Sequence, residues 1–196
     1  MQNFVQCKPI KFINTFFEKY AIYFFALAII TLNYSLAFDN VMWGDEAFSG
    51  VVIRDTDLHG IFERIYFWDS HPPLYYYWLR LLADIFGYSI PVYHFSALIP
   101  FTAGILMAVF IFRKKFGLIP TAFFITISGL SGVCAEYNLE IRMYALVFAE
   151  LLICSYSAYR ISENNARIYH WILLTSFGVL AAYTHYFGLV SGSILL

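Results

Sequence analysis

Six apolar segments limit what this chain can fold into more than any other feature of its sequence. A helix needs about 20 consecutive apolar residues to cross the hydrocarbon core of a bilayer, and lipid does not tolerate exposed irregular backbone. The segments therefore predict an all-α fold, a multi-pass bundle of transmembrane helices. They lie at about residues 20–38, 92–112, 118–134, 143–159, 169–183 and 187–196.

The composition excludes an ordinary soluble protein. Hydrophobic residues make up 61% of the 196 residues and charged residues only 13%, whereas a soluble domain carries about 25% charged residues. A body of this size exposes much of its surface, so it cannot hide so much apolar area from water. The formal net charge of -1 gives no sign of a nucleic-acid binder, and we expect no nucleic-acid partner.

The two ends of the chain carry further expectations. The sequence Ser35-Leu36-Ala37 resembles a signal-peptide cleavage site, but it lies within an apolar run of about 19 residues, which is longer than that of a signal peptide. We therefore expect an uncleaved first span. The segment at 187–196 is too short for a full crossing, which predicts the N-terminal part of a longer protein.

Basic residues set the expected orientation, because short cytoplasmic loops are enriched in lysine and arginine. With the N-terminus in the cytoplasm, the inner side contains Lys8, Lys11, Lys19, Arg113, Lys114, Lys115, Arg160 and Arg167. The outer side contains only Arg54, Arg64, Arg80 and Arg142, although it includes the longest connection, residues 39–91. We therefore expect that connection, the outer loop, to lie outside the cytoplasm.

The outer loop is acidic, with eight carboxylates against three arginines between residues 39 and 91. Its apolar residues recur at helical spacing over about 48–66 and again over 74–85. This pattern predicts short amphipathic helices that lie along the membrane interface. We expect Trp43, Trp68 and Trp78 in the headgroup region, which aromatic side chains prefer.

Two adjacent carboxylates, Asp45 and Glu46, follow the first span closely. Such a pair can bind a cation, or one member can take a proton from an attacking hydroxyl when burial and mutual repulsion raise its pKa. The same pair also suits the start of an amphipathic helix, where negative charge interacts favourably with the helix dipole. The local pattern leaves both interpretations open.

His71 precedes a tandem proline, Pro72-Pro73. The prolines require an extended entry and then suit the first turn of a helix. His71 would thus lie at a rigid corner, where it could contact a phosphate or a hydroxyl of a substrate. The sequence is equally typical of a structural turn.

Charged residues also precede the fourth span. Glu136, Glu140 and Tyr144 have the spacing of one helix face. Arg142, a cation at the mouth of a span, is a functional candidate because unpaired charge is costly there. It could bind an anionic group at the membrane surface, or form an ion pair with Glu140 or a lipid headgroup.

His185 follows the fifth span, on the side expected for Asp45 and His71. Two histidines and an acid could bind zinc, but their spacing does not support such a site; we assign no metal ligand, although a divalent metal remains possible. The cysteines, Cys7, Cys134 and Cys154, show no paired or metal-binding spacing either. Glu150 lies within the fourth span and either has a polar partner inside the bundle or lines a pathway.

Taken together, these motifs resemble the GT-C membrane glycosyltransferases, and in particular the bacterial relatives of the dolichyl-phosphate-mannose protein mannosyltransferases. Members of that group have a first span, an outer loop that opens with an Asp-Glu pair, and a His-Pro-Pro-Leu element before an aromatic-rich helix. The corresponding residues here are Asp45-Glu46 and His71 to Leu74. The segments Glu140 to Leu146 and Tyr183 to Tyr186 resemble two further elements of the bacterial branch.

The resemblance implies inverting transfer of a sugar from a polyprenyl-phosphate donor to an acceptor hydroxyl on a lipid, glycan or protein. It also implies a bacterial plasma membrane with the reaction on its extracytoplasmic face. Asp45 would be the catalytic base and Glu46 its partner or a group that positions the acceptor. His71 and Arg142 would contact the phosphate, and Glu140, Tyr144 and His185 would contribute to substrate binding.

Two alternatives to this hypothesis remain. The chain could be a non-catalytic protein that binds or transports lipids, although transporters favour broken helices at the midplane and internal repeats. It could also be an inactive truncated fragment of the enzyme.

Overall fold

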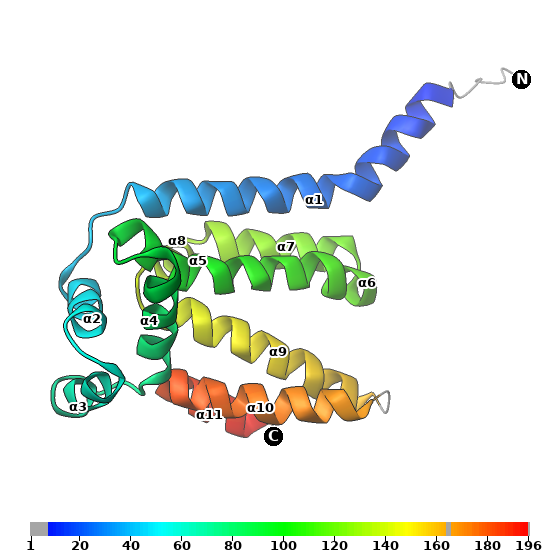
Figure 1. Ribbon diagram of the computed structural model, residues 1–196. Helices are drawn as coiled ribbons and strands as arrows, with labels where there is room; N and C mark the ends of the chain where they lie inside the picture. Colours follow the sequence, from blue (N-terminus) through cyan, green and yellow to red (C-terminus); the bar gives the residue numbers. More distant parts are fainter. Residues whose placement is uncertain (1–7, 164–165, 196) are drawn as a thin grey trace, which may run out of the picture.

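The computed structural model describes residues 8–163 and 166–195, with side chains from residue 20 onward. Within these ranges the chain forms helices and no strands (Figure 1). The predicted all-α fold is therefore confirmed. Cys7 lies outside the described residues, as do the side chains of Lys8, Lys11 and Lys19.

Within the described residues, three helices are long and apolar enough to cross a membrane. The first is α1 (Lys8–Phe38), of which Tyr20–Phe38 is apolar. The second starts with α5 (Ile90–Met107) and continues through the π-helical turn η1 (Ala108–Phe112) into α6 (Arg113–Phe116). The third is α9 (Tyr144–Ser162). These helices match the predicted spans at 20–38, 92–112 and 143–159.

The predicted span at 118–134 corresponds to a bent pair of helices. Helix α7 (Leu118–Leu130) and helix α8 (Gly132–Leu139) meet at an angle of 63°. Ser131, between them, has an extended backbone, which interrupts the helical hydrogen bonds. The side-chain amide of Asn138 donates a hydrogen bond of 2.7 Å to the backbone carbonyl of Ser128. This bond satisfies one of the groups that the bend leaves without a helical partner.

Two shorter apolar helices complete the bundle, α10 (Ile168–Thr184) and α11 (Tyr186–Leu195). They match the predicted segments at 169–183 and 187–196, but full crossing by either helix stays a prediction. Their contact is close at Gly188, where a Cβ atom would lie 2.1 Å from the carbonyl oxygen of Ala181. Only glycine fits there, so the two helices can approach at this point.

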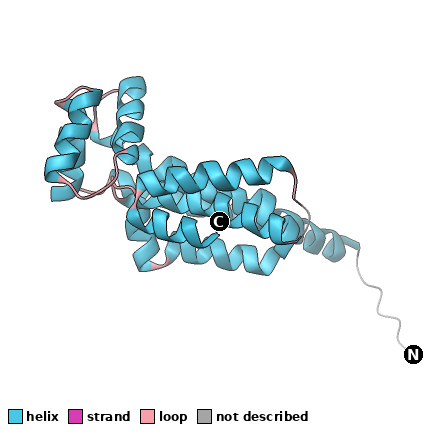
Figure 2. Cartoon of the chain, turned by 90° about the horizontal axis from the view of Figure 1, so that it is seen from below, coloured by secondary structure: helices cyan, strands magenta, loops and turns pink. Residues whose placement is uncertain are grey.

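The outer loop folds into α2 (Gly44–Arg54), α3 (Leu58–Trp68) and α4 (Leu74–Phe86), which lie at one end of the bundle (Figure 1). Viewed from below, α2 and α3 project beyond the long helices (Figure 2). The apolar faces of the three helices pack into a core that includes Ile53, Ile61, Tyr75, Tyr76 and Leu79. The predicted short amphipathic helices are therefore present.

The apolar pattern over 48–66 forms two helices, since residues 55–57 separate α2 from α3. Asp57 caps the start of α3 by accepting a hydrogen bond from the amide of Gly60, at 2.7 Å. Trp43 and Trp68 are exposed. Trp78, however, is partly buried, and its indole donates a hydrogen bond of 2.9 Å to the carbonyl of Ser96.

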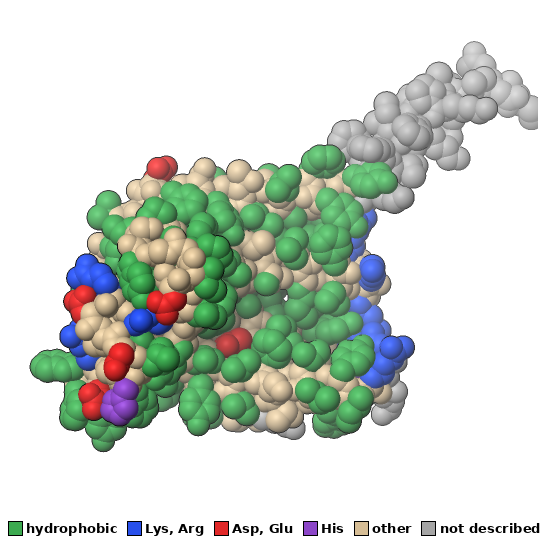
Figure 3. Space-filling model, viewed as in Figure 1, with side chains coloured by type: hydrophobic (Ala, Val, Ile, Leu, Met, Phe, Trp, Pro, Cys, Tyr) green, Lys and Arg blue, Asp and Glu red, His purple; other side chains and the backbone are tan. Residues whose placement is uncertain are grey.

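The surface of the bundle is that of a membrane protein. Large apolar side chains are exposed along its helices, among them Phe24, Leu27, Ile119, Phe123 and Val190. Figure 3 shows hydrophobic side chains covering the long helices and a group of lysines and arginines at the end opposite α2 and α3. An apolar exterior on helices of sufficient length indicates association with a membrane.

Candidate functional site

Arg142 is the centre of the candidate site. It lies in the turn between α8 and α9, and only 4% of its surface is exposed. The predicted shared helix face of Glu136, Glu140 and Tyr144 is wrong, because α8 ends at Leu139 and α9 begins at Tyr144. Because the helix is interrupted at residues 140–143, the direction of the Arg142 side chain is not set by helical periodicity. The side chain is buried in the site.

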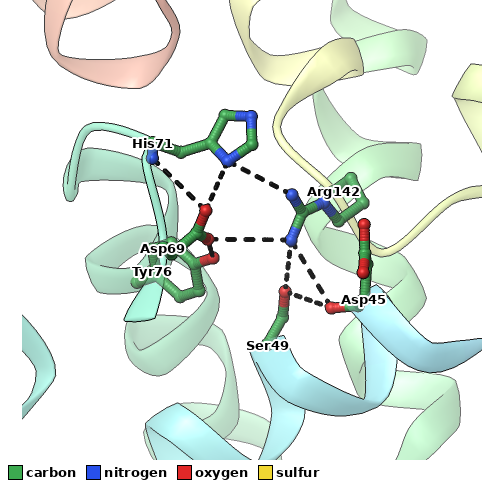
Figure 4. Close-up of polar contacts among 6 residues, drawn as sticks. All are labelled: Asp45, Ser49, Asp69, His71, Tyr76 and Arg142. Carbon is green, nitrogen blue, oxygen red and sulfur yellow. Dashed lines mark hydrogen bonds and ion pairs between the residues drawn. The ribbon is translucent and has the colours of Figure 1, made fainter. Parts of the chain in front are cut away.

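The guanidinium of Arg142 contacts groups from two segments of the outer loop (Figure 4). Its Nη1 donates to Ser49 Oγ at 3.3 Å and to the main-chain oxygen of Asp45 at 3.5 Å. The same nitrogen lies 4.0 Å from Asp69 Oδ2. Its ion-pair partner is thus Asp69, not Glu140 as one interpretation of the sequence had it.

Asp69 organises the other side of the site. Its Oδ1 lies 2.6 Å from His71 Nδ1, and its Oδ2 accepts a hydrogen bond from the Tyr76 hydroxyl. Burial opposes ionisation of Asp69, but the hydrogen bonds from His71 and Tyr76 and the charge of Arg142 lower its pKa to about 2. Asp69 is therefore ionised at neutral pH.

One corner of the guanidinium remains available for a ligand. Arg142 Nη2 lies 3.4 Å from His71 Nδ1, but that ring nitrogen already donates its proton to Asp69 and has no lone pair to accept another. Within the described residues, no other acceptor lies within hydrogen-bonding distance of Nη2. An anion is therefore the kind of group that would complete the hydrogen bonding of this nitrogen.

The two carboxylates of the Asp45-Glu46 pair have different environments. Glu46 is fully buried; its Oε1 accepts from the amide of Ile141 at 2.7 Å and its Oε2 from the amide of Trp43 at 3.0 Å. It therefore fastens the start of α2 to the turn that holds Arg142. Asp45 is exposed, and its carboxylate makes no hydrogen bond within the described part of the chain.

Two more of the predicted residues lie here, His185 beside His71 and Tyr144 beside His185. The ring of His185 lies 5.3 Å from that of His71 and 5.7 Å from that of Tyr144, measured between centroids. Its Nδ1 accepts a hydrogen bond from the amide of Phe187, at 3.0 Å. Burial lowers the pKa of His185, as do the nearby His71 and Arg142. His185 is therefore a neutral ring at the edge of the site.

Glu140 lines a separate cavity of about 440 Å³, together with Trp43, Glu136 and Leu139. Its Oε2 is buried and has no hydrogen-bond partner within the described residues. Burial raises the pKa of Glu140, and the charges of Glu46 and Glu136 raise it further. A second cavity, of about 360 Å³, is lined on one side by Asp69 and His71.

The sequence analysis missed three residues of the site, which are Ser49, Asp69 and Tyr76. The sequence does contain a local sign that Asp69 belongs to the site, since it precedes His71 by two residues, next to the same pair of prolines. Among the described residues, no three His, Cys, Asp or Glu side chains are placed to hold a metal ion. Glu150 has a polar partner, because the Thr184 hydroxyl donates to its Oε1 at 3.1 Å.

Comparisons with protein-family models, with curated proteins and with solved structures found no match to this chain.

Proposed function

We propose that this chain is part of a membrane glycosyltransferase of the GT-C type, which transfers a sugar from a polyprenyl-phosphate donor to an acceptor hydroxyl at the extracytoplasmic surface. One observation carries the proposal. A buried arginine with an unfilled donor corner lies beside an open carboxylate, at one end of a bundle of membrane helices. The phosphate of a lipid-linked donor lies at the membrane surface, and a cation at that surface would bind it and stabilise its charge.

Asp45 is the proposed catalytic base. It takes the proton of the acceptor hydroxyl, whose oxygen attacks the anomeric carbon from the face opposite the phosphate. The bond between that carbon and the phosphate oxygen breaks, and its electron pair leaves with the polyprenyl phosphate. The anomeric configuration is inverted, and the base ends the step protonated.

The geometry favours Asp45 over its acidic neighbours for this role. Both oxygens of Glu46 accept backbone hydrogen bonds, and both oxygens of Asp69 have partners. The pKa of Asp69, lowered to about 2, also makes it a poor proton acceptor. We assign Glu46 and Asp69 to positioning, the first of the Arg142 turn and the second of His71.

Arg142 and His71 are the proposed contacts of the departing phosphate. Nη2 of Arg142 would donate to a phosphate oxygen. The negative charge that develops on the departing phosphate would be stabilised in a site largely shielded from water. Tyr144 and His185 add an aromatic wall on the same side. Such a wall suits the isoprenoid carbons next to the phosphate, or a face of the sugar.

Replacement of Asp45 by asparagine tests the proposal. Membranes that contain the full protein would be supplied with a panel of polyprenyl-phosphate sugars and acceptors, and the transferred sugar would be measured. We expect Asp45→Asn to lower transfer by at least about 100-fold, the usual contribution of a general base. Asp39→Asn is the matched control, since Asp39 is an exposed acid of the same loop.

The outcomes separate the alternatives. Transfer by Asp45→Asn at the wild-type rate would remove Asp45 from the mechanism. Binding of the lipid phosphate without transfer of any sugar of the panel would favour the lipid-binding alternative.

A further inference from the structure

A large cavity lies at the end of the bundle opposite the candidate site. It has a volume of about 680 Å³ and lies between the segment α5–η1–α6 and the helices α9 and α10. None of its lining residues belongs to the site around Arg142. Its walls divide into an apolar part and a basic part, and each part restricts what the cavity can hold.

The apolar part consists of large hydrophobic side chains that leave room for a hydrocarbon chain. They come from the α5–η1 segment, α9 and α10, and are Met107, Phe110, Ile111, Ile153, Leu173 and Phe177. The π-helical turn η1 forms part of this wall. Such turns occur often at functional sites, because they displace side chains from the regular helical positions.

The basic part is formed by Lys114, Lys115 and Arg160. Lys115 has an ion-pair partner in Glu163, at 2.7 Å. Lys114 has no ion pair among the described residues, and the Nε of Arg160 is buried without a hydrogen-bond partner there. A buried donor that lacks an acceptor costs free energy, so an anion beside the Nε of Arg160 would be stabilised. Lys114 is exposed and adds a second positive charge on the same wall.

A buried hydroxyl points to a ligand independently of the charges. Ser157 lines the cavity and has no exposed surface, yet its Oγ has no hydrogen-bond partner in the described part of the chain. His170, on the same wall, accepts a hydrogen bond at Nδ1 from the amide of Arg167, at 3.0 Å. The neutral ring therefore carries its proton on Nε2 and is a further potential donor.

We infer that this cavity binds an anionic phospholipid. The phosphate of its headgroup lies between Lys114 and Arg160, and an acyl chain follows the apolar wall. Basic pockets between membrane helices bind such headgroups on the cytoplasmic side, and this end of the bundle carries the basic residues that the orientation rule assigns to the cytoplasm. A free phosphate would leave the apolar wall without a partner. The inference does not depend on glycosyl transfer.

The test measures thermal unfolding of the full protein in phosphatidylcholine nanodiscs, with and without phosphatidylglycerol. We expect phosphatidylglycerol to raise the Tm by about 4 °C. The double variant Lys114→Gln/Arg160→Gln should lose this rise. Arg167→Gln is the matched control, because it removes an exposed charge at the same end of the bundle and outside the cavity, and it should keep the rise.

A second variant keeps every charge. Ser157→Leu places a larger apolar side chain in the cavity and should at least halve the rise, with helical content by circular dichroism unchanged. The inference is overturned if both variants respond like the wild type, or if Arg167→Gln loses the rise to the same extent as the double variant. An equal rise with inorganic phosphate alone would show a free-anion site and overturn the assignment to a lipid.

Discussion

At the scale of single residues, the charge of Arg142 determines how its neighbours ionise. Burial acts to lower the pKa of Arg142, but the electrostatic effects of Tyr76, Asp69 and Asp45 raise it overall. A permanently charged guanidinium then favours the carboxylate form of Asp69. Asp69 balances the charge of Arg142, while Nη2 of Arg142 still lacks an acceptor. An anion would complete the hydrogen bonds of this arginine.

The ionisation of Asp69 predicts a dependence of stability on pH. The pKa of Asp69 is about 2 in the folded protein and about 3.9 in an unfolded chain. Because the folded value is the lower one, its contribution is complete above about pH 4 and is lost as the pH falls toward 2. With allowance for solvent screening, we expect about 1 kcal/mol from this group.

Thermal unfolding of the wild type and Asp69→Asn between pH 7 and pH 2 checks this expectation. The wild type should be the more stable at pH 7, and the two curves should converge below pH 4. Asp39→Asn should run parallel to the wild type throughout. A difference between wild type and Asp69→Asn that stays constant down to pH 2 would show that ionisation of Asp69 contributes no stability.

At the scale of elements, Glu46 connects α2 to the turn between α8 and α9. Gln in its place would still accept one of the two backbone hydrogen bonds, but would turn an amide N–H toward the other donor. We expect Glu46→Gln to destabilise this contact by about 1–2 kcal/mol. Hydrogen exchange should show faster exchange at the amides of Ile141 and Trp43.

Asp45→Asn is the control for that experiment, because the side chain of Asp45 makes no hydrogen bond within the described residues. It should leave exchange at both amides unchanged while it lowers sugar transfer by at least about 100-fold. Equal loss of protection in both variants would contradict the division of the pair into a catalytic base and a positioning residue.

The contact of α10 with α11 gives a second prediction at this scale. A methyl group at Gly188 would lie 2.1 Å from the carbonyl oxygen of Ala181, whereas at Gly192 the nearest atom would lie at 3.5 Å. Gly188→Ala should therefore separate the helices and lower the Tm by several degrees, because rigid backbone cannot yield as a side chain does. Gly192→Ala should be tolerated, and equal Tm values for both variants would contradict this packing.

The sequence predicts most helices because apolar length and periodicity are local properties. It predicts the segment of α9 to within a few residues. It does not predict the interruption at residues 140–143, since the amide of Ile141 is satisfied by Glu46, a residue 95 positions away in the sequence. A local pattern such as Glu136, Glu140, Tyr144 continues as a helix unless a tertiary contact supplies another partner.

The same distinction holds for the site. His71, Arg142 and His185 are recognisable from the sequence, because they are polar residues beside predicted spans on one expected side. Ser49 and Tyr76 are not, since a serine and a tyrosine in amphipathic helices are common. Only the packing of α2 and α4 against the Arg142 turn gives them their role.

At the scale of the whole molecule, the two ends of the bundle differ in charge, as is typical of a protein that crosses a membrane. One end carries the acidic helices α2 to α4 and the candidate site, and the other carries the lysines and arginines beside the cavity of about 680 Å³ (Figure 3). The distribution of basic residues predicts that the first end faces away from the cytoplasm. Both proposals depend on this orientation. The phosphate of the sugar donor must lie at the extracytoplasmic surface, and the phosphate of the bound phospholipid at the cytoplasmic surface.

Single cysteines test the orientation directly. In a variant without Cys7, Cys134 and Cys154, Glu63→Cys places a thiol on the exposed face of α3, and Ser162→Cys places one at the far end of α9. A membrane-impermeant maleimide should label Glu63→Cys in intact cells and Ser162→Cys only after lysis. The reverse pattern would put Asp45 and Arg142 on the cytoplasmic side, where an extracytoplasmic donor could not reach them.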